Sequence, residues 1–332
     1  MGDSALEAVL EARSQGGAFK DLFDFAERID AKRVNRGVLE ALIAGGAFDA
    51  TLLPRKISRA RAFAAVDRAL ERARNASRDR ERGQTSLFAM FAAAEPPSAT
   101  VASEYPEAAP WDLKETLLRE KEALGFYVSG HPLDRYGIEL SRFEVSKASA
   151  IAAMSNWSRV KVCGMVEEYN CRIFKGGGGK VARFKLEDPT GRVDVKVREK
   201  QIDQFEEILQ SKEPVLVSGK VSFPMTDDED ENAAPREPTL MLDDVVPLGT
   251  MLREQAKWVH VRLREARHGV DGASRLSEVF AGSPGTCPIQ ITVELEGGSE
   301  VSLAVPGVRV EPNDALFSGV EKLFGSRVLE LR

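Results

Sequence analysis

Apolar residues recur at helical spacing through the first part of the chain. Leu6, Val9 and Leu10 fall on one face of a helix, and Gly16-Gly17 ends the pattern. Residues 39–48 repeat the Leu-Glu-Ala start and the Gly-Gly-Ala-Phe end of residues 6–19. This repetition predicts two helical hairpins, whose backbone amides can face phosphates. A small helical bundle without a ligand is the alternative.

Further helical segments follow. Residues 57–82, rich in Arg and Ala, predict one long helix with a thin apolar stripe that ends at Gly83. Residues 92–110 are rich in Ala, Pro, Ser and Glu, which is typical of a flexible linker. Another helix is expected from Pro110-Trp111 to Gly125.

After Arg159 the apolar period changes from helical to two, which indicates strands. Strands are expected around residues 160–166, 181–186, 193–197, 215–221 and 239–246, with a helix between the third and the fourth. Five short strands with a helix in that place match the order of an OB-fold barrel.

From about Met251 the pattern mixes both types, with helices at 274–280 and 313–323 and strands at 289–295 and 301–305. The sequence therefore predicts a multidomain α+β protein with a small C-terminal α+β domain. We expect helical hairpins and a basic helix at 1–82, a linker at 83–110, a helical connector at 111–150, an OB-fold domain at 155–249 and a last domain at 250–332.

Composition is that of a soluble globular protein, with 43% hydrophobic and 30% charged residues among 332. No run approaches the ~18 apolar residues that cross a bilayer. The net charge is −6, but its distribution is uneven. Residues 55–82 and 159–200 are locally basic, whereas residues 201–249 are strongly acidic. A solvated face is the simple interpretation of each charged run, and a nucleic-acid contact is the alternative for the basic ones.

Catalytic motifs are not evident. Phosphate-binding loops of the GxxxxGK[ST] type, GxSxG elbows and HExxH motifs do not occur. The acids at 227–231 lack the glycine and the ligand alternation of a calcium loop, so we interpret them as a solvated loop. His131 stands between a glycine and a proline, which favours a structural turn over a catalytic base.

The sharpest local signal is the segment Gln84–Phe88, which lies beside the predicted linker. Leu87 and Phe88 can fill an apolar pocket on a partner while the Gln84 amide fixes the register at its rim. The alternative is that Phe88, Met90 and Phe91 fold back on a neighbouring helix.

Several motifs occur in one order along the chain. Together they closely resemble the C-terminal part of the α subunit of bacterial DNA polymerase III, a replicative DNA polymerase. The carriers of this resemblance are Arg36–Ile43 with Gly45–Asp49, Gly83-Gln84 with Leu87-Phe88, Glu120–Glu122 with Leu124–Leu133, Leu186–Asp188 with Thr190–Val193, and Val217–Phe223.

The resemblance implies a role for each region. The N-terminal helices resemble the end of a tandem helix-hairpin-helix module that grips duplex DNA. The barrel resembles the OB domain that contacts single-stranded template, and the last domain resembles the one that joins α to the clamp-loader τ subunit. The segment that matches the internal motif for the β sliding clamp is Gln84, Thr85, Ser86, Leu87 and Phe88.

Cations interleaved with aromatic residues in the barrel predict backbone pairing and base stacking. An acidic insertion at 226–237, in the loop before the last strand, would repel phosphate and oppose this. The residues expected to contact nucleic acid are Arg172, Phe174, Lys175, Lys180, Arg183, Phe184 and Lys185 of the barrel, with Arg59 and Arg61 of the helical region.

The family's PHP domain and its palm, whose carboxylates hold two metal ions, have no counterpart in the sequence. We therefore expect no polymerisation by this chain alone and no cofactor, since Mg²⁺ belongs to the palm. The leading hypothesis is a non-catalytic replication module in the bacterial cytoplasm, at the replisome. The alternatives are a fragment of a longer active polymerase, including an error-prone relative, and a stand-alone OB-fold protein that binds RNA or DNA.

Overall fold

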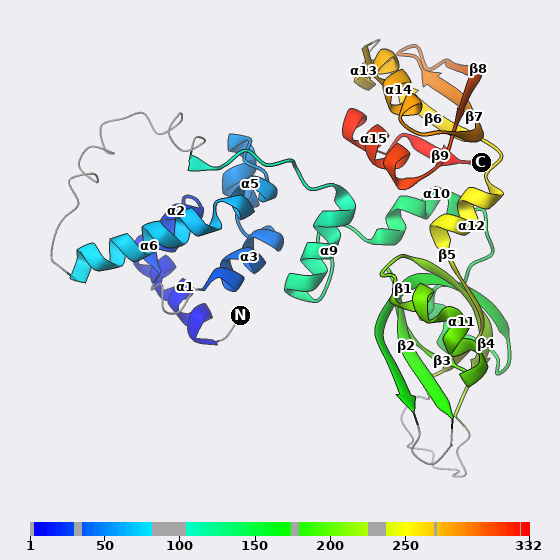
Figure 1. Cartoon of the computed structure of the whole chain (residues 1–332), viewed down its shortest axis with the longest axis horizontal. Coiled ribbons are helices and arrows are strands. Elements are labelled where there is room, and N and C mark those ends of the chain that lie inside the picture. Colours follow the sequence, from blue (N-terminus) through cyan, green and yellow to red (C-terminus); the bar gives the residue numbers. More distant parts are fainter. Residues whose placement is uncertain are drawn as a thin grey trace. The chain divides into compact units, whose positions relative to one another are not determined.

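The computed structural model describes residues 3–29, 35–81, 104–173, 179–224, 237–268, 271–325 and 327–332. The chain forms two compact units, Met1–Gly130 and His131–Arg332. The first unit is helical, and the second holds a β-barrel and a separate β-sheet (Figure 1).

Glycines and polar caps delimit the helices of the first unit. The predicted stops are confirmed, because Gly17 and Gly46 have φ of 72° and 78°, a left-handed conformation that glycine adopts without strain. Asn35 and Asp112 cap helices by accepting backbone N–H bonds. The helices are α1 (Asp3–Gly16), α2 (Leu22–Arg28), α3 (Arg36–Ala44), α4 (Asp49–Leu52), η1 (Leu53–Arg55), α5 (Arg59–Ala64), α6 (Val66–Glu81) and α9 (Leu113–Leu124).

The long helix predicted over 57–82 is wrong in one respect, since it breaks into α5 and α6 at Ala65. The Ala65 N–H bonds both the Arg61 and the Ala62 carbonyls, each at 3.1 Å, which tightens the last turn of α5. Ala62, Ala65 and Val66 are fully buried in the core of this unit. Packing at this point, rather than helix propensity, sets the break.

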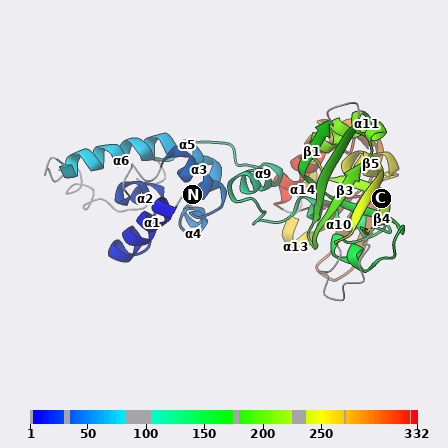
Figure 2. The same cartoon turned by 90° about the horizontal axis from the view of Figure 1, so that it is seen from below.

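The second unit contains the predicted barrel, which is confirmed as a closed five-stranded barrel of order β1-β2-β3-β5-β4. Figure 2 shows the strands wrapping around one another, with α11 packed beside them. Ile202, Phe205 and Leu209 of α11 are buried in the barrel core. The elements are β1 (Arg159–Ile173), β2 (Lys180–Asp188), β3 (Gly191–Val197), α11 (Glu199–Gln210), β4 (Val215–Ser222) and β5 (Thr239–Pro247).

The C-terminal domain has a four-stranded sheet of order β8-β7-β6-β9. The predicted strands and helices of this region are present, but β6 and β9 were not expected. The elements are α12 (Leu248–Gln255), β6 (Val259–Arg264), α13 (Glu265–His268), α14 (Asp271–Ala281), β7 (Pro284–Glu294), β8 (Glu300–Val310), α15 (Asp314–Phe324) and β9 (Leu329–Leu331).

The predicted connector is divided between the units, because α9 belongs to the first and η2 (Pro132–Tyr136), α10 (Gly137–Leu140) and η3 (Ala148–Ala153) to the second. Buried Glu139 of α10 pairs with Arg327 at 2.7 Å and accepts the Leu331 N–H. The Nδ1 of His131 accepts the Leu133 N–H, so this histidine caps a turn.

Among the described residues, no single helix has the length and apolar composition to cross a membrane. The helices Arg36–Ala44 and Asp49–Arg55 together meet these criteria, but they are bent by 73° where they meet. Their residues Leu39, Ile43 and Leu52 belong to the buried core of the helical unit.

Candidate nucleic-acid interface

Strand alternation decides which residues of β2 can meet a ligand. Ala182, Phe184 and Leu186 are at most 1% exposed and lie in the barrel core, whereas Arg183 and Lys185 between them point outward. The prediction that Phe184 stacks on a base is therefore wrong. The same alternation that exposes the two cations places the ring inside the barrel.

Two of the predicted barrel lysines are paired with carboxylates. Lys185 Nζ lies 2.7 Å from Glu168 Oε2, and Lys180 Nζ lies 3.1 Å from Asp203 Oδ1. Hydrogen bonding to these carboxylates raises the pKa of each lysine. Phosphate can reach either ammonium only by sharing it with, or displacing, its carboxylate.

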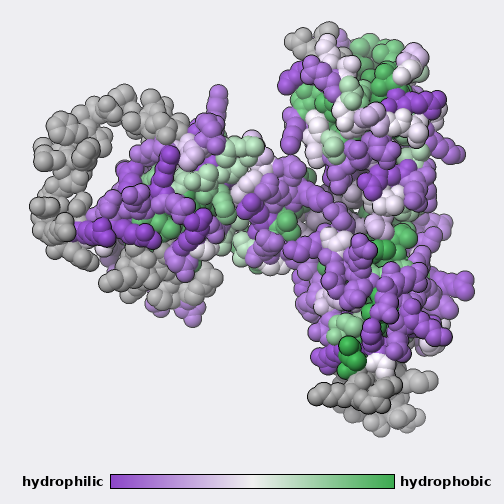
Figure 3. All heavy atoms as spheres, in the orientation of Figure 1, coloured by the Kyte–Doolittle hydropathy of each residue, from purple (hydrophilic) through white to green (hydrophobic). Residues whose placement is uncertain are grey.

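Of the other predicted barrel residues, two are exposed and two are not described. Arg172 and Arg183 are exposed on neighbouring strands. Phe174 and Lys175 lie outside the described residues. Figure 3 shows that hydrophilic side chains cover much of the visible barrel surface.

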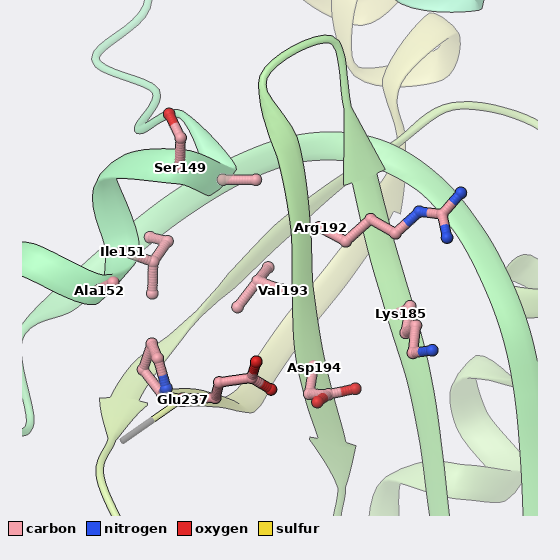
Figure 4. Close-up of a pocket in the computed structure, with 10 residues that line it drawn as sticks. Ser149, Ile151, Ala152, Lys185, Arg192, Val193, Asp194 and Glu237 are labelled. Carbon is pink, nitrogen blue, oxygen red and sulfur yellow. The ribbon is translucent and has the colours of Figure 1, made fainter. Parts of the chain in front are cut away.

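A pocket of about 390 Å³ lies beside β2 and β3. Figure 4 shows Ile151 of η3 and Val193 of β3 on its two sides. Its charged lining residues are of both signs: Lys185, Arg192, Asp194 and Glu237. This mixture of charge does not select a phosphate over a cation.

Further outward cations of the barrel stand at positions that no sequence motif marked. Lys196 of β3 lies directly opposite Arg183 in the ladder, and Arg159 of β1 lies directly opposite Lys220 of β4. Alternation alone marks each of them as outward-facing. Only the strand register brings them together, and one sequence does not contain the register.

In the helical unit, Arg59 is largely buried, with 15% of its side chain exposed. Its guanidinium contacts Asp49 at 2.6 Å and Glu120 at 2.7 Å, and it also donates to the Ala44 carbonyl at 3.1 Å. Hydrogen bonding to Asp49, reinforced by Glu120, raises the pKa of Arg59 despite its burial. The guanidinium is thus engaged within the unit, and its contact with phosphate stays a prediction.

Arg61 is also engaged within the helical unit. It donates to the Tyr105 carbonyl at 2.9 Å and pairs with Glu107 at 2.9 Å. On α6, by contrast, Arg74 and Arg78 are exposed. Exposed cations of this basic stretch therefore lie on both sides of the two that were predicted, at Arg55 and Lys56 before them and on α6 after them.

Glu120 explains why the segment after α9 has a defined shape. Its side chain is 0% exposed, and it accepts the backbone N–H groups of Val128 and Ser129, each at 2.8 Å. Burial by itself would raise the pKa of Glu120. Hydrogen bonds from Arg59, Ser129 and Val128 outweigh it and lower the pKa from 4.5 to about 2. A charged carboxylate thus holds the loop against the helices.

The predicted clamp-binding segment Gln84–Phe88 lies outside the described residues, as does most of the acidic insertion at 226–237. The five acids at 227–231 are among those not described. Elsewhere, in the part of the chain that the structure covers, no group of three or more His, Cys, Asp or Glu residues is placed to hold a metal ion.

Comparison with known proteins agrees with the observed helical unit and β-barrel. A helix-hairpin-helix motif family matches residues 1–62, and an OB-fold nucleic acid binding domain family matches residues 160–248. DNA polymerase III subunit alpha of Vibrio cholerae is 30% identical over 333 residues, which covers 100% of this chain. The chain is homologous to DNA polymerase III subunit alpha. The family resemblance is thereby confirmed.

The chain spans about 27% of the length of that alpha subunit, and it matches the C-terminal part. The alpha subunit of Thermus aquaticus is 33% identical over 313 residues, with 93% of this chain and 23% of the relative covered. Among solved structures, mitochondrial single-stranded DNA binding protein Rim1 of S. cerevisiae aligns with 28% of this chain and 97% of its own. Its identity is 16% and its TM-score 0.23, so it carries no weight for function.

Proposed function

We propose that the chain is a non-catalytic module of DNA replication that keeps a polymerase of the alpha-subunit family on its DNA. The observation that supports this most is the homology to the alpha subunit along 100% of the chain. Within the module, the helical unit would contact duplex DNA and the barrel single-stranded template. The outward cations of the barrel supply the positive charge that such a contact needs.

DNA binding is tested with the full chain and fluorescein-labelled oligonucleotides, single-stranded and duplex, at several salt concentrations. Binding that weakens steeply as salt rises is expected, because phosphate neutralisation releases counterions. Binding that is absent, or indifferent to salt, contradicts this part of the proposal. RNA that outcompetes DNA would favour the stand-alone OB-fold alternative.

The tether to the β sliding clamp is proposed through Gln84–Phe88. Leu87→Ala/Phe88→Ala removes both apolar anchors and should weaken clamp binding at least tenfold, because such anchors carry most of the free energy of a small interface. Met90→Ala/Phe91→Ala removes similar apolar volume just beyond the motif and should leave the affinity within about twofold. Equal losses in the two variants would refute the tether. The same titration, performed with the τ subunit and a chain lacking residues 250–332, tests the proposed contact with the clamp loader.

A second candidate function follows because the chain covers only about 27% of the length of its alpha-subunit relative. If these residues belong to a longer polymerase, the activity is that of the whole protein, including Mg²⁺-dependent nucleotidyl transfer by a palm. An antibody raised to the barrel distinguishes the candidates in a cell lysate. A species much larger than 36.4 kDa supports the longer polymerase, and a species at 36.4 kDa supports the module alone.

A further inference from the structure

One register row of the barrel collects basic side chains from four strands. In the ladders, Arg183 of β2 lies opposite Lys196 of β3, which lies opposite Met241 of β5. The row continues from Met241 to Lys220 of β4 and then to Arg159 of β1. We call these residues the basic row.

The members of the basic row point away from the barrel core. Arg183 and Arg159 are exposed, and the three residues between them in the row are half-buried. Each alternates along its strand with residues of the barrel core. The long side chains can therefore lay their apolar stems on the barrel while their charges stay in water.

The arrangement contains two like-charge pairs, Arg183 with Lys196 and Arg159 with Lys220. Like charges directly opposite each other in a sheet are destabilising. Within the described part of the chain, none of these cations forms an ion pair with a carboxylate. The row therefore keeps positive charge that the barrel itself does not neutralise.

Neighbouring cations on the same barrel behave differently. Lys180, Lys185 and Arg192 each lie within 3.3 Å of a carboxylate oxygen, from Asp203, Glu168 and Glu187 respectively. Among the described barrel strands, the cations outside the row that also lack an ion pair, Lys161 and Arg172, both lie on β1, so the row is the line in which unpaired cations of different strands meet. A line of this kind matches an extended polyanion better than it matches a single phosphate.

The spacing also fits a nucleic-acid strand. Adjacent strands lie about 4.8 Å apart, so the four steps from Arg183 to Arg159 cover about 19 Å, measured along the barrel surface. The two cation pairs are separated by Met241, whose thioether makes favourable contacts with aromatic rings. The cation pairs at the two ends of the row suit phosphates, and the apolar, adaptable Met241 side chain between them suits a base. An acidic peptide offers no ring for Met241.

We propose that the basic row, Arg183, Lys196, Met241, Lys220 and Arg159, is the track along which the barrel binds the backbone of a single-stranded nucleic acid. This inference rests on the proposed DNA contact of the barrel. It moves that contact from the predicted lysines, which are already paired, to the row that includes β3, β4 and β5.

The test is fluorescence anisotropy of the full chain with a labelled oligothymidine of about 20 nucleotides, long enough for one OB fold, across a salt series. Lys196→Gln/Lys220→Gln removes one cation from each like-charge pair. For single strands the slope of log K against log[salt] changes by about 0.7 for each phosphate contact, so this variant should lose about 1.4 of slope. If affinity at 1 M salt is unchanged, the same relation gives about 25-fold weaker binding at 0.1 M.

The matched control is Lys180→Gln/Lys185→Gln, which removes the same charge from paired lysines of the same barrel. It should change the affinity less than about threefold, because each lysine is already neutralised. Unfolding temperatures serve as the folding check: the row variant should be at least as stable as the wild type, since it relieves like-charge repulsion. A row variant that binds normally, or a control that loses as much, overturns the basic row.

Two further outcomes separate this inference from the proposed function. If the wild type does not bind the oligonucleotide at any salt concentration, both the proposed DNA contact and the basic row are refuted. If the wild type binds with a steep salt dependence but the two double variants have the same affinity, only the basic row is refuted. Competition with polyglutamate provides the last arm: displacement as efficient as that by unlabelled oligothymidine would make the row a general acid-binding surface and overturn its assignment to nucleic acid.

Discussion

Glu120→Gln should destabilise the helical unit by removing a single buried charge. The wild-type carboxylate contacts the Arg59 guanidinium at 2.7 Å and the Val128 and Ser129 N–H groups at 2.8 Å. Glutamine is nearly the same size, so the variant changes charge and hydrogen bonding rather than volume. The amide brings two N–H donors to a site whose neighbours are all donors.

Two arguments give similar magnitudes for this loss. The shift in the pKa of Glu120 from 4.5 to about 2 corresponds to about 3 kcal/mol of unfolding free energy at neutral pH. Breaking a buried ion pair by removing one partner costs about 3–5 kcal/mol. Because Arg59 keeps Asp49 at 2.6 Å, we expect the lower end, about 3 kcal/mol.

The assay needs a signal from the helical unit alone. Trp157→Phe/Trp258→Phe, at two exposed positions of the second unit, leaves Trp111 as the reporter of urea unfolding. Glu120→Gln should lower the unfolding free energy of the Trp111 transition by about 3 kcal/mol. Glu40→Gln, which removes one partner of a more exposed ion pair of α3, should lower it by less than about 1 kcal/mol.

Acid titration provides an independent check. Since folding lowers the pKa of Glu120, its contribution is complete above about pH 4.5 and is lost as the pH falls toward 2. The difference between wild type and Glu120→Gln should therefore be constant from pH 7 to 5 and shrink below that. A difference under 1 kcal/mol at pH 7, or one that grows on acidification, would refute the reasoning.

Three further outcomes are expected. Burial lowers the pKa of His260, so unfolding temperatures of the C-terminal domain should fall between pH 7 and 5.5, and His260→Gln should flatten that decline. Gly219→Ala places a Cβ against the Met241 carbonyl oxygen of β5 and should lower the unfolding free energy of the barrel by about 1–3 kcal/mol in urea, whereas Gly137→Ala, with open space around it, should lower the unfolding free energy by less than about 1 kcal/mol. Iodoacetamide at pH 8, followed by peptide mass mapping, should label exposed Cys171 well before Cys163, whose pKa burial raises to about 12.

Periodicity predicted much of the fold because it depends on local geometry. The switch from helical spacing to alternation near Arg159 placed the strands of the barrel, and the Gly16-Gly17 and Gly45-Gly46 stops placed the ends of α1 and α3. Strand β9, only Leu329–Leu331, was missed because three residues are too few to show a period. The break at Ala65 was missed because alanine favours helix on either side of it.

The candidate site was predictable only in part. Cationic and aromatic residue types indicated a nucleic-acid ligand, and the order of the motifs indicated a resemblance to the alpha subunit. Residue types and motif order are both properties of the linear sequence. The sequence did not show which cations already form ion pairs within the protein. Lys185 is neutralised by Glu168 from β1, and Arg59 by Glu120, which lies 61 positions away.

The sequence by itself determined most of the elements, the OB-fold order of the barrel and the resemblance to the alpha subunit, because hydrophobic period, turn residues and motif order are encoded along one dimension. Only the tertiary structure decided that Phe184 is core, that Glu120 is a buried anion, and that Arg183, Lys196, Lys220 and Arg159 share one row. Register and ion pairing depend on distances between residues far apart in the chain. Those distances exist only once the barrel has closed.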